Sequence, residues 1–293
     1  MQTIGTWKRF RPIKRGRLDD KTVYERESVY VRARDVVEQT LRDIRSRENG
    51  IKRSAEATAY LKNHPTSKSE YLLARLIVQA PGAARAQREM DTHHGGYKNR
   101  QARLFELIDF NDTFVDTVLS LSRDQLRTFT VRCRAEIDTY CEQVGVKSFD
   151  DRQFEAIVHG LSREIAVYRG AIAEGFRARM TSRVQDSMGI DMIITDPATK
   201  KSLSIDVKTD SAFHFRLLDL QHSRRIDESV RMQCELAGFC AMRNGHGYRA
   251  VDTVLLRIDT DRLGEINYYE FADTRKFGEL LRSALKHYGK YIV

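Results

Sequence analysis

Three side chains that could do chemistry lie within one short stretch of this chain: Asp191, Asp206 and Lys208. Two carboxylates held close together repel each other unless a cation lies between them. Carboxylate oxygens suit Mg²⁺, which keeps several waters and completes its shell with a phosphate. An ammonium group beside such a site can stabilise a developing negative charge or help to deprotonate a water molecule. Two acids, a divalent metal and a lysine are therefore the groups of a phosphodiester-cleaving centre.

The sequence around these residues predicts a β-hairpin that brings them together. Residues 192–194 form a short apolar run, Asp196-Pro197 initiates a turn, and residues 202–208 alternate between apolar and polar. Folded about this turn, the hairpin sets Asp191 opposite Asp206, with Cβ atoms about 4.5–5.5 Å apart. The pairs predicted on its apolar face are Met192 with Ile205 and Ile194 with Leu203. The alternative is an ordinary solvated strand face, on which these charges do no chemistry.

This stretch and the helix predicted before it resemble the PD-(D/E)xK nuclease superfamily, which includes type II restriction endonucleases, resolvases and RecB-like nucleases. The resemblance covers about residues 165–209 and rests on Gly170-x-x-x-Glu174, Gly189-Ile190-Asp191 and Asp206-Val207-Lys208. One departure is that no proline precedes Asp191. The resemblance implies an α/β, restriction-endonuclease-like fold with a mixed sheet flanked by helices. It also implies hydrolysis of nucleic acid that depends on Mg²⁺, for which Mn²⁺ can substitute.

A third acid is expected to complete the metal shell, directly or through water. Glu174 lies among small residues between positions 170 and 178, which let a helix approach a sheet closely. We therefore expect Asp191, Asp206 and Glu174 as metal ligands. Glu164, on the same predicted helix, is the rival for the place of Glu174. Asp186 ranks lower, as a further ligand or as the cap of a turn.

Helical periodicity dominates the first half of the chain. The helices expected there cover about 27–46, 53–62, a segment that either Ser67 or Ser69 caps, 97–108, 113–121 and 124–144. Pro81-Gly82 is expected to end the third of them. We therefore predict an all-helical domain over residues 1–149, which grips nucleic acid or serves as a scaffold, and an α/β domain over residues 150–293.

The second half predicts a sheet flanked by helices. The expected elements are a helix that starts at Ser148-Phe149-Asp150-Asp151 and that Gly160 could divide, the hairpin, a loop over 209–216, a helix over 219–242, strands over 251–258 and 265–271, and a last helix after Asp273. The strands would form a sheet of four or five members.

The charge balance indicates a polyanionic partner. The net charge is +9 and the isoelectric point is about 9.4, which suits nucleic acid or an acidic membrane surface. Residues 1–150 carry 28 Lys+Arg against 21 Asp+Glu, hence +7, and residues 151–293 carry 22 against 20, hence +2. The basic run over residues 8–17 is either an arm on the phosphate backbone or a solvated terminus. This imbalance suits a protein that grips DNA with one part and cuts it with the other.

Other classes of protein are disfavoured by the sequence. No run reaches the ~18 apolar residues of a membrane span, and the first residues lack the apolar core of a signal peptide. The four cysteines show no Cys-x-x-Cys spacing, which argues against a zinc site. We therefore expect a cytoplasmic protein without a membrane partner.

Three functions remain open at this point. The leading one is a restriction-type or defence endonuclease acting on DNA, for which a homodimer would match the symmetry of the duplex. The second is a RecB-like repair or replication exonuclease, which Gln233 on a late helix suits, although Ala237 replaces the aromatic residue expected in that group. The third is a non-catalytic nucleic-acid-binding protein with an inert nuclease-like fold.

Overall fold

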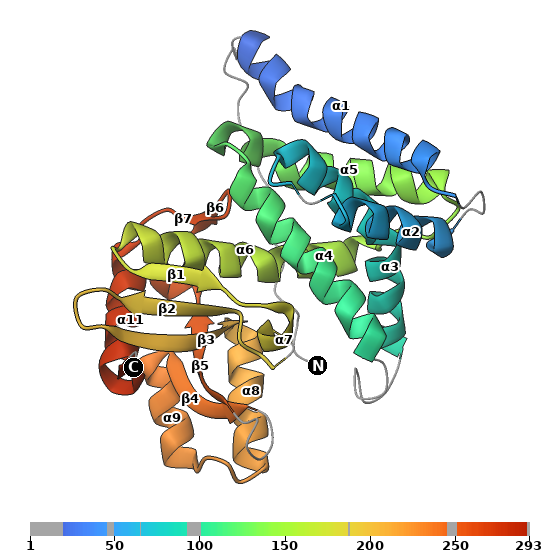
Figure 1. Cartoon of the computed structure of the whole chain (residues 1–293). Coiled ribbons are helices and arrows are strands. Elements are labelled where there is room, and N and C mark those ends of the chain that lie inside the picture. Colours follow the sequence, from blue (N-terminus) through green and yellow to red (C-terminus); the bar gives the residue numbers. More distant parts are fainter. Residues whose placement is uncertain are drawn as a thin grey trace, which may run out of the picture.

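The computed structural model describes residues 20–45, 50–64, 66–92, 101–186, 188–244 and 251–291. Figure 1 shows a group of helices, coloured blue to green, that lies against a sheet flanked by further helices, coloured yellow to red. The basic run over residues 8–17 lies outside the described residues. No helix in the described ranges combines the length and the apolar character needed to cross a membrane.

The described residues of the N-terminal part form five helices, where the periodicity predicts six. They are α1 (Asp20–Asp43), α2 (Ile51–Lys62), α3 (Ser69–Thr92), α4 (Gln101–Ser120) and α5 (Arg123–Gln143). Two expected breaks are absent, because α3 continues through Pro81 and α4 joins the helices predicted over 97–108 and 113–121. Pro81 is buried among alanines in the middle of the bundle. Tertiary packing there outweighs the roughly 3 kcal/mol that a proline costs inside a helix.

Helix α6 (Asp151–Ala173) belongs to both halves of the molecule. Asp150 caps it, accepting a hydrogen bond from the backbone of Gln153 at 2.8 Å, and Gly160 does not interrupt it. Its first half, up to Ile165, packs into the helical core. Its second half, from Ala166, packs on the sheet. A Cβ at Gly170 would lie 3.0 Å from the rings of Phe271 and Phe277, so α6 needs glycine there to pack closely against these two side chains.

The main sheet is mixed, and its strands come in the order β1-β2-β3-β5-β4, with β8 also paired to β3. The strands are β1 (Arg177–Met180), β2 (Met192–Asp196), β3 (Lys201–Thr209), β4 (Phe239–Asn244), β5 (Val251–Ile258) and β8 (Lys290–Tyr291). Strands β3 and β5 run parallel, and the other neighbours run antiparallel. The expected α/β class, mixed sheet and helical N-terminal region are therefore confirmed.

Helices cover both faces of this sheet (Figure 1). On one face, α6 and α11 (Arg275–Tyr288) enclose a core that includes Met192, Ile205 and Phe277. On the other face, α8 (Asp210–His222) and α9 (Glu228–Ala237) enclose a smaller core around Phe213 and Leu255. The short helices α7 (Arg183–Asp186) and α10 (Thr260–Leu263) lie in the connections.

Three predicted elements of the second half are wrong, and the first is the loop over 209–216, which is instead the start of α8. The helix expected over 219–242 is instead the end of α8, the whole of α9 and the strand β4. The strand expected over 265–271 is a separate hairpin of β6 (Ile266–Asn267) and β7 (Glu270–Phe271). Tyr268 and Tyr269 have φ of 50° and 65° at its turn, which is the twist of a tight type I′ hairpin. Tyr269 is held there because its ring packs into the helical core.

Candidate active site

The predicted hairpin is present in the predicted register. Strands β2 and β3 pair Met192 with Ile205 and Ile194 with Leu203. Asp191 directly precedes β2, and its N–H donates to the carbonyl of Ile205 at 2.8 Å. The two carboxylates, Asp191 and Asp206, therefore lie opposite each other at the end of the hairpin, as the sequence predicts.

Lys208 lies beside this pair of acids. Residues 206 and 208 project from the same face of β3 because side chains alternate along a strand. The Nζ of Lys208 donates a hydrogen bond to Oδ1 of Asp206. Asp206 is only 5% exposed, whereas the Lys208 side chain is 31% exposed. The carboxylate of Asp206 is thus inside the protein, whereas the side chain of Lys208 is partly accessible to solvent.

The carboxyl group of Asp191 lies next to another acid on a half-buried residue. Its Oδ2 accepts a hydrogen bond from the backbone N–H of Val207 at 2.6 Å. Burial, followed by the charge of Asp206, raises the pKa of Asp191 to about 8, although Lys208 and the Val207 N–H oppose the shift. Burial also raises the pKa of Asp206, against the charge of Lys208. The pKa of Lys208 is raised despite burial, because Asp206 and Asp191 stabilise its ammonium form.

Glu164, and not Glu174, is the glutamate close to these residues. Burial, followed by the charges of Asp191 and Asp186, raises the pKa of Glu164 well above its ordinary value. Glu174 caps the end of α6 and is bound elsewhere, since Thr274 and Arg282 each donate to it at 2.7 Å. The sequence held a signal for this choice. Glu164 falls on the apolar stripe of its helix, where a charged residue is unusual and indicates a role in the interior.

Asp186 also belongs to this group of acids. It ends the short helix α7, and the turn that follows includes a hydrogen bond of 2.7 Å from the N–H of Gly189 to its carbonyl. Gly189 has φ of 76°, a conformation that favours glycine. Burial raises the pKa of Asp186, Asp206 contributes to the same shift, and Lys208 opposes it. The turn between Asp186 and Asp191 thus places two acids at one end of the sheet.

A basic residue that the sequence analysis missed approaches the site from α8. Residues 209–216 were expected to be a loop, but Thr209 caps a helix there by accepting a hydrogen bond from the N–H of Ala212. Arg216 on this helix lowers the pKa of Asp206 through its charge, and it also pairs with Asp219 at 2.7 Å. The polar Thr-Asp-Ser sequence was the available signal, since such residues cap helices as well as form loops.

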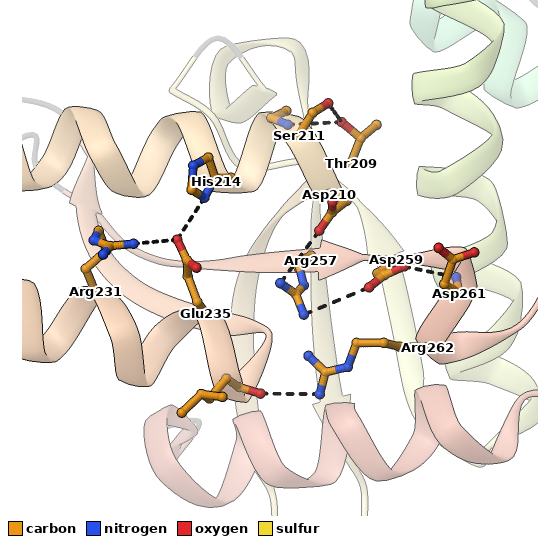
Figure 2. A network of polar contacts seen from close by, with 12 residues as sticks. Thr209, Asp210, Ser211, His214, Arg231, Glu235, Arg257, Asp259, Asp261 and Arg262 are labelled. Carbon is orange, nitrogen blue, oxygen red and sulfur yellow. Dashed lines mark hydrogen bonds and ion pairs between the residues drawn. The ribbon is translucent and has the colours of Figure 1, made fainter. Parts of the chain in front are cut away.

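Polar contacts on the same face of the sheet hold α8 in position. Figure 2 shows Arg257, on β5, between Asp210 at the start of α8 and Asp259 after the strand. The closest atoms of these pairs are 3.6 and 3.9 Å apart. His214 and Arg231 both contact Glu235 at 2.9 Å, which ties α8 to α9. The helix that carries Arg216 is therefore anchored to the strand next to β3.

The donor atoms suit a hard divalent cation by their chemistry. Asp191, Asp206, Glu164 and Asp186 offer only carboxylate oxygens, and the charges of neighbouring acids help to raise the pKa values of Asp191, Glu164 and Asp186. A cation would relieve that repulsion. Their present arrangement is not that of a closed site: no three His, Cys, Asp or Glu side chains within the described ranges are grouped so that they could hold a metal ion.

Comparisons with protein-family models, curated proteins and solved structures find no match for this chain. The geometry of the hairpin and its charged neighbours is therefore the basis for any assignment of function.

Proposed function

We propose that this protein is a Mg²⁺-dependent nuclease that hydrolyses DNA phosphodiester bonds, with a restriction-type or defence endonuclease as the leading form. The observation that carries the proposal is the pair of opposed acids, Asp191 and Asp206, with Lys208 bound to one of them. The restriction-endonuclease-like fold is part of the same proposal. The α/β class and the mixed sheet are consistent with it.

Asp191, Asp206 and Glu164 would hold the metal ion in this proposal, and Glu164 takes the place first expected for Glu174. The metal would supply a Lewis acid for the phosphate and a water of lowered pKa. Lys208 keeps its proton, because the acids around it raise its pKa. Its role is therefore to orient a water molecule and to offset negative charge that develops on the phosphate. Arg216, close to Asp206, adds a second positive charge at the same place.

The grip on DNA is expected to come largely from the first residues of the chain. Residues 1–19 carry six Lys+Arg against one Asp, hence +5, which leaves +2 of the +7 of residues 1–150 for residues 20–150. The helical bundle is therefore close to neutral. Phosphate contacts by a short basic segment would give affinity without sequence specificity.

Incubation of the purified chain with supercoiled plasmid, in Mg²⁺ and in EDTA, tests this proposal. Wild-type protein should cut the plasmid only in Mg²⁺. The variants Asp191→Asn and Lys208→Ala should still bind DNA but should not cut it. Glu174→Gln is the matched control and should cut like wild type. Discrete products from circular DNA would indicate an endonuclease, whereas a requirement for DNA ends would indicate the RecB-like alternative.

A non-catalytic nucleic-acid-binding protein is the second candidate, and one observation favours it. The acids are not grouped as a closed metal site in the described ranges, and Lys208 already occupies one oxygen of Asp206. Such a protein would bind DNA with a steep dependence on salt and would leave plasmid intact in Mg²⁺ and in Mn²⁺.

A further inference from the structure

One face of the main sheet belongs to neither of its two cores. Along β3, Ser202 and Ser204 project from the same face as Asp206, because side chains alternate along a strand. Helices α6 and α11 pack on the opposite face, against residues such as Ile205. Helix α8 lies on the face of Asp206, but its core is formed with β4 and β5 and includes Leu255, the partner of Asp206. The part of this face that β1, β2 and β3 form is left outside both cores.

Two rows of paired side chains cross these three strands. They are Arg179, Ile193 and Ser204 in one row, and Arg177, Thr195 and Ser202 in the other. Residues paired across strands project from the same face of a sheet, so both arginines share the face of Asp206. The four residues on β2 and β3 are half-buried, and the two arginines are exposed. These six residues are called the outer face below. Strand β1 ends the order of the sheet, so the arginines lie at its edge.

The outer face leads directly to the acids of the candidate active site. The next row along the strands contains Asp191, because the N–H of Thr181 donates to the carbonyl of Asp191 at 3.1 Å. At about 3.3 Å per residue and 4.8 Å between strands, the Cα of Arg179 lies roughly 8 Å from that of Asp191. The Cα of Arg177 lies roughly 14 Å away by the same reckoning. A polymer that reaches the acids can therefore also contact both arginines.

The two arginines are available to bind an anion. Among the residues that the structure describes, neither Arg177 nor Arg179 makes an ion pair or a side-chain hydrogen bond. The outer face itself contains no acidic side chain. On the other side of β3, Arg216 of α8 brings a positive charge close to Asp206. The acids thus have cations on both sides, an arrangement that suits a polyanion lying across the site.

We propose that the outer face binds the backbone of duplex DNA, with Arg177 and Arg179 contacting phosphates on one side of the bond that is cut. This inference rests on the proposed nuclease function and says where its substrate lies. The outer face has no aromatic side chain on which the bases of a single strand would stack. Its small hydroxyl side chains, Thr195, Ser202 and Ser204, can donate to phosphate oxygens. Such contacts position a duplex without reading its sequence.

Fluorescence anisotropy of a short DNA duplex with the full chain in EDTA tests the inference without cleavage. The double variant Arg177→Gln/Arg179→Gln should bind about tenfold more weakly at low salt. Its slope of log affinity against log salt should fall by about 2, one for each phosphate contact. Arg177→Lys/Arg179→Lys should keep most of the affinity, because lysine keeps the charge. Wild-type protein should bind the single strand of the same sequence more weakly than the duplex.

Lys147→Gln/Arg152→Gln is the matched control, since it also removes two exposed positive charges. Arg152 lies 21 residues before Ala173, hence roughly 30 Å from the end of α6 that leads into β1. This control should bind the duplex like wild type. A second measurement needs no variant: the duplex should protect Arg177 and Arg179, but not Arg152, from modification by phenylglyoxal, as read by mass spectrometry.

Three results would overturn the inference. They are wild-type affinity in the Arg177→Gln/Arg179→Gln variant, an equal loss of affinity in the control, and tighter binding of the single strand. Its failure is distinct from that of the nuclease. If the duplex binds through the arginines but plasmid stays intact in Mg²⁺, the outer face is a DNA-binding surface and the nuclease proposal fails. If wild type cuts plasmid and the glutamine variant binds and cuts equally well, the nuclease proposal holds and the outer face does not bind the substrate.

Discussion

Replacement of Asp191 by Asn should make the metal-free protein more stable while it abolishes cleavage. The folded protein raises the pKa of Asp191 to about 8, whereas an aspartate in an unfolded chain titrates near 3.9. A carboxyl group whose pKa is raised on folding contributes stability that is fully present below the unfolded value. That stability is lost as pH rises toward the folded value. Wild-type protein in EDTA should therefore lose stability between about pH 4 and pH 8.

The magnitude follows from the size of this shift. About four pKa units correspond to roughly 5 kcal/mol at most. Asp191 is only half-buried, so screening by solvent reduces this, and we expect a gain on the order of 2 kcal/mol for Asp191→Asn at pH 8. The asparagine oxygen can still accept the hydrogen bond from Val207, so the backbone contact is kept. Below about pH 4 the two proteins should unfold alike, because the wild-type acid is then protonated in both states.

Urea unfolding in EDTA at pH 5 and pH 8 measures this difference. Asp196→Asn is the matched control at the other end of β2, because hydrogen bonds from Thr199 and the Ala198 N–H lower the pKa of Asp196. That control should lose stability, by less than about 1 kcal/mol. If Asp191→Asn is less stable than wild type at pH 8, or if it still cuts DNA, then Asp191 is an ordinary structural residue and the electrostatic reasoning fails.

Three further predictions concern the charged groups around the hairpin. Glu164→Gln should lower Mg²⁺-dependent cleavage at least about 100-fold, whereas Glu174→Gln should change it less than about twofold; single-turnover rates on plasmid DNA measure both. Arg216→Ala should slow cleavage about 10- to 100-fold and leave the midpoint of Mg²⁺ activation unchanged, if it acts on the phosphate rather than on the metal. Deletion of residues 1–19 should reduce the slope of log affinity against log salt by up to about 5, measured by fluorescence anisotropy with a DNA duplex.

The hairpin could be predicted because its information is local. The Asp-Pro turn and the alternation of β3 fix the register between residues that are close in the chain, and a slip of one residue would expose every apolar side chain of the pair. Asp191, Asp206 and Lys208 follow from that register alone. The start of helix α8 could not be predicted in the same way, because a polar Thr-Asp-Ser segment fits a loop as well as a helix cap.

The strand β4 could not be predicted from the sequence for a different reason. Residues 219–242 combine a real helix, α9, with an apolar strand that continues its periodicity, and short apolar runs do not distinguish the two. Gly238 marks the boundary, since its φ of 79° ends the helix in a left-handed conformation. A glycine after the last helical residue is a stop signal that the sequence does carry.

The place of Glu164 on the apolar stripe of its helix predicts that it is buried, but which acid lies near β3 depends on how α6 crosses the molecule. Both acids lie on one helix. Only the packing of that helix decides which of them comes near β3 and which one meets α11 instead. Glu174 instead accepts a hydrogen bond from Arg282, which is more than a hundred residues distant in the chain.

The position of Glu164 also indicates that the helical part belongs to the site. Glu164 lies directly before Ile165 and Ala166, where α6 passes from the helical core to the sheet core. Helix α4 adds Asp112, whose pKa is raised to about 7 by burial and by the charge of Asp186. A boundary at residues 149–150 therefore separates two sequence patterns, but the acids of this group come from both sides of it, Asp112 before it and Glu164 after it. The helical bundle adds to the burial and the field at the carboxylates, and in the proposed nuclease it would therefore contribute to the affinity for the metal ion.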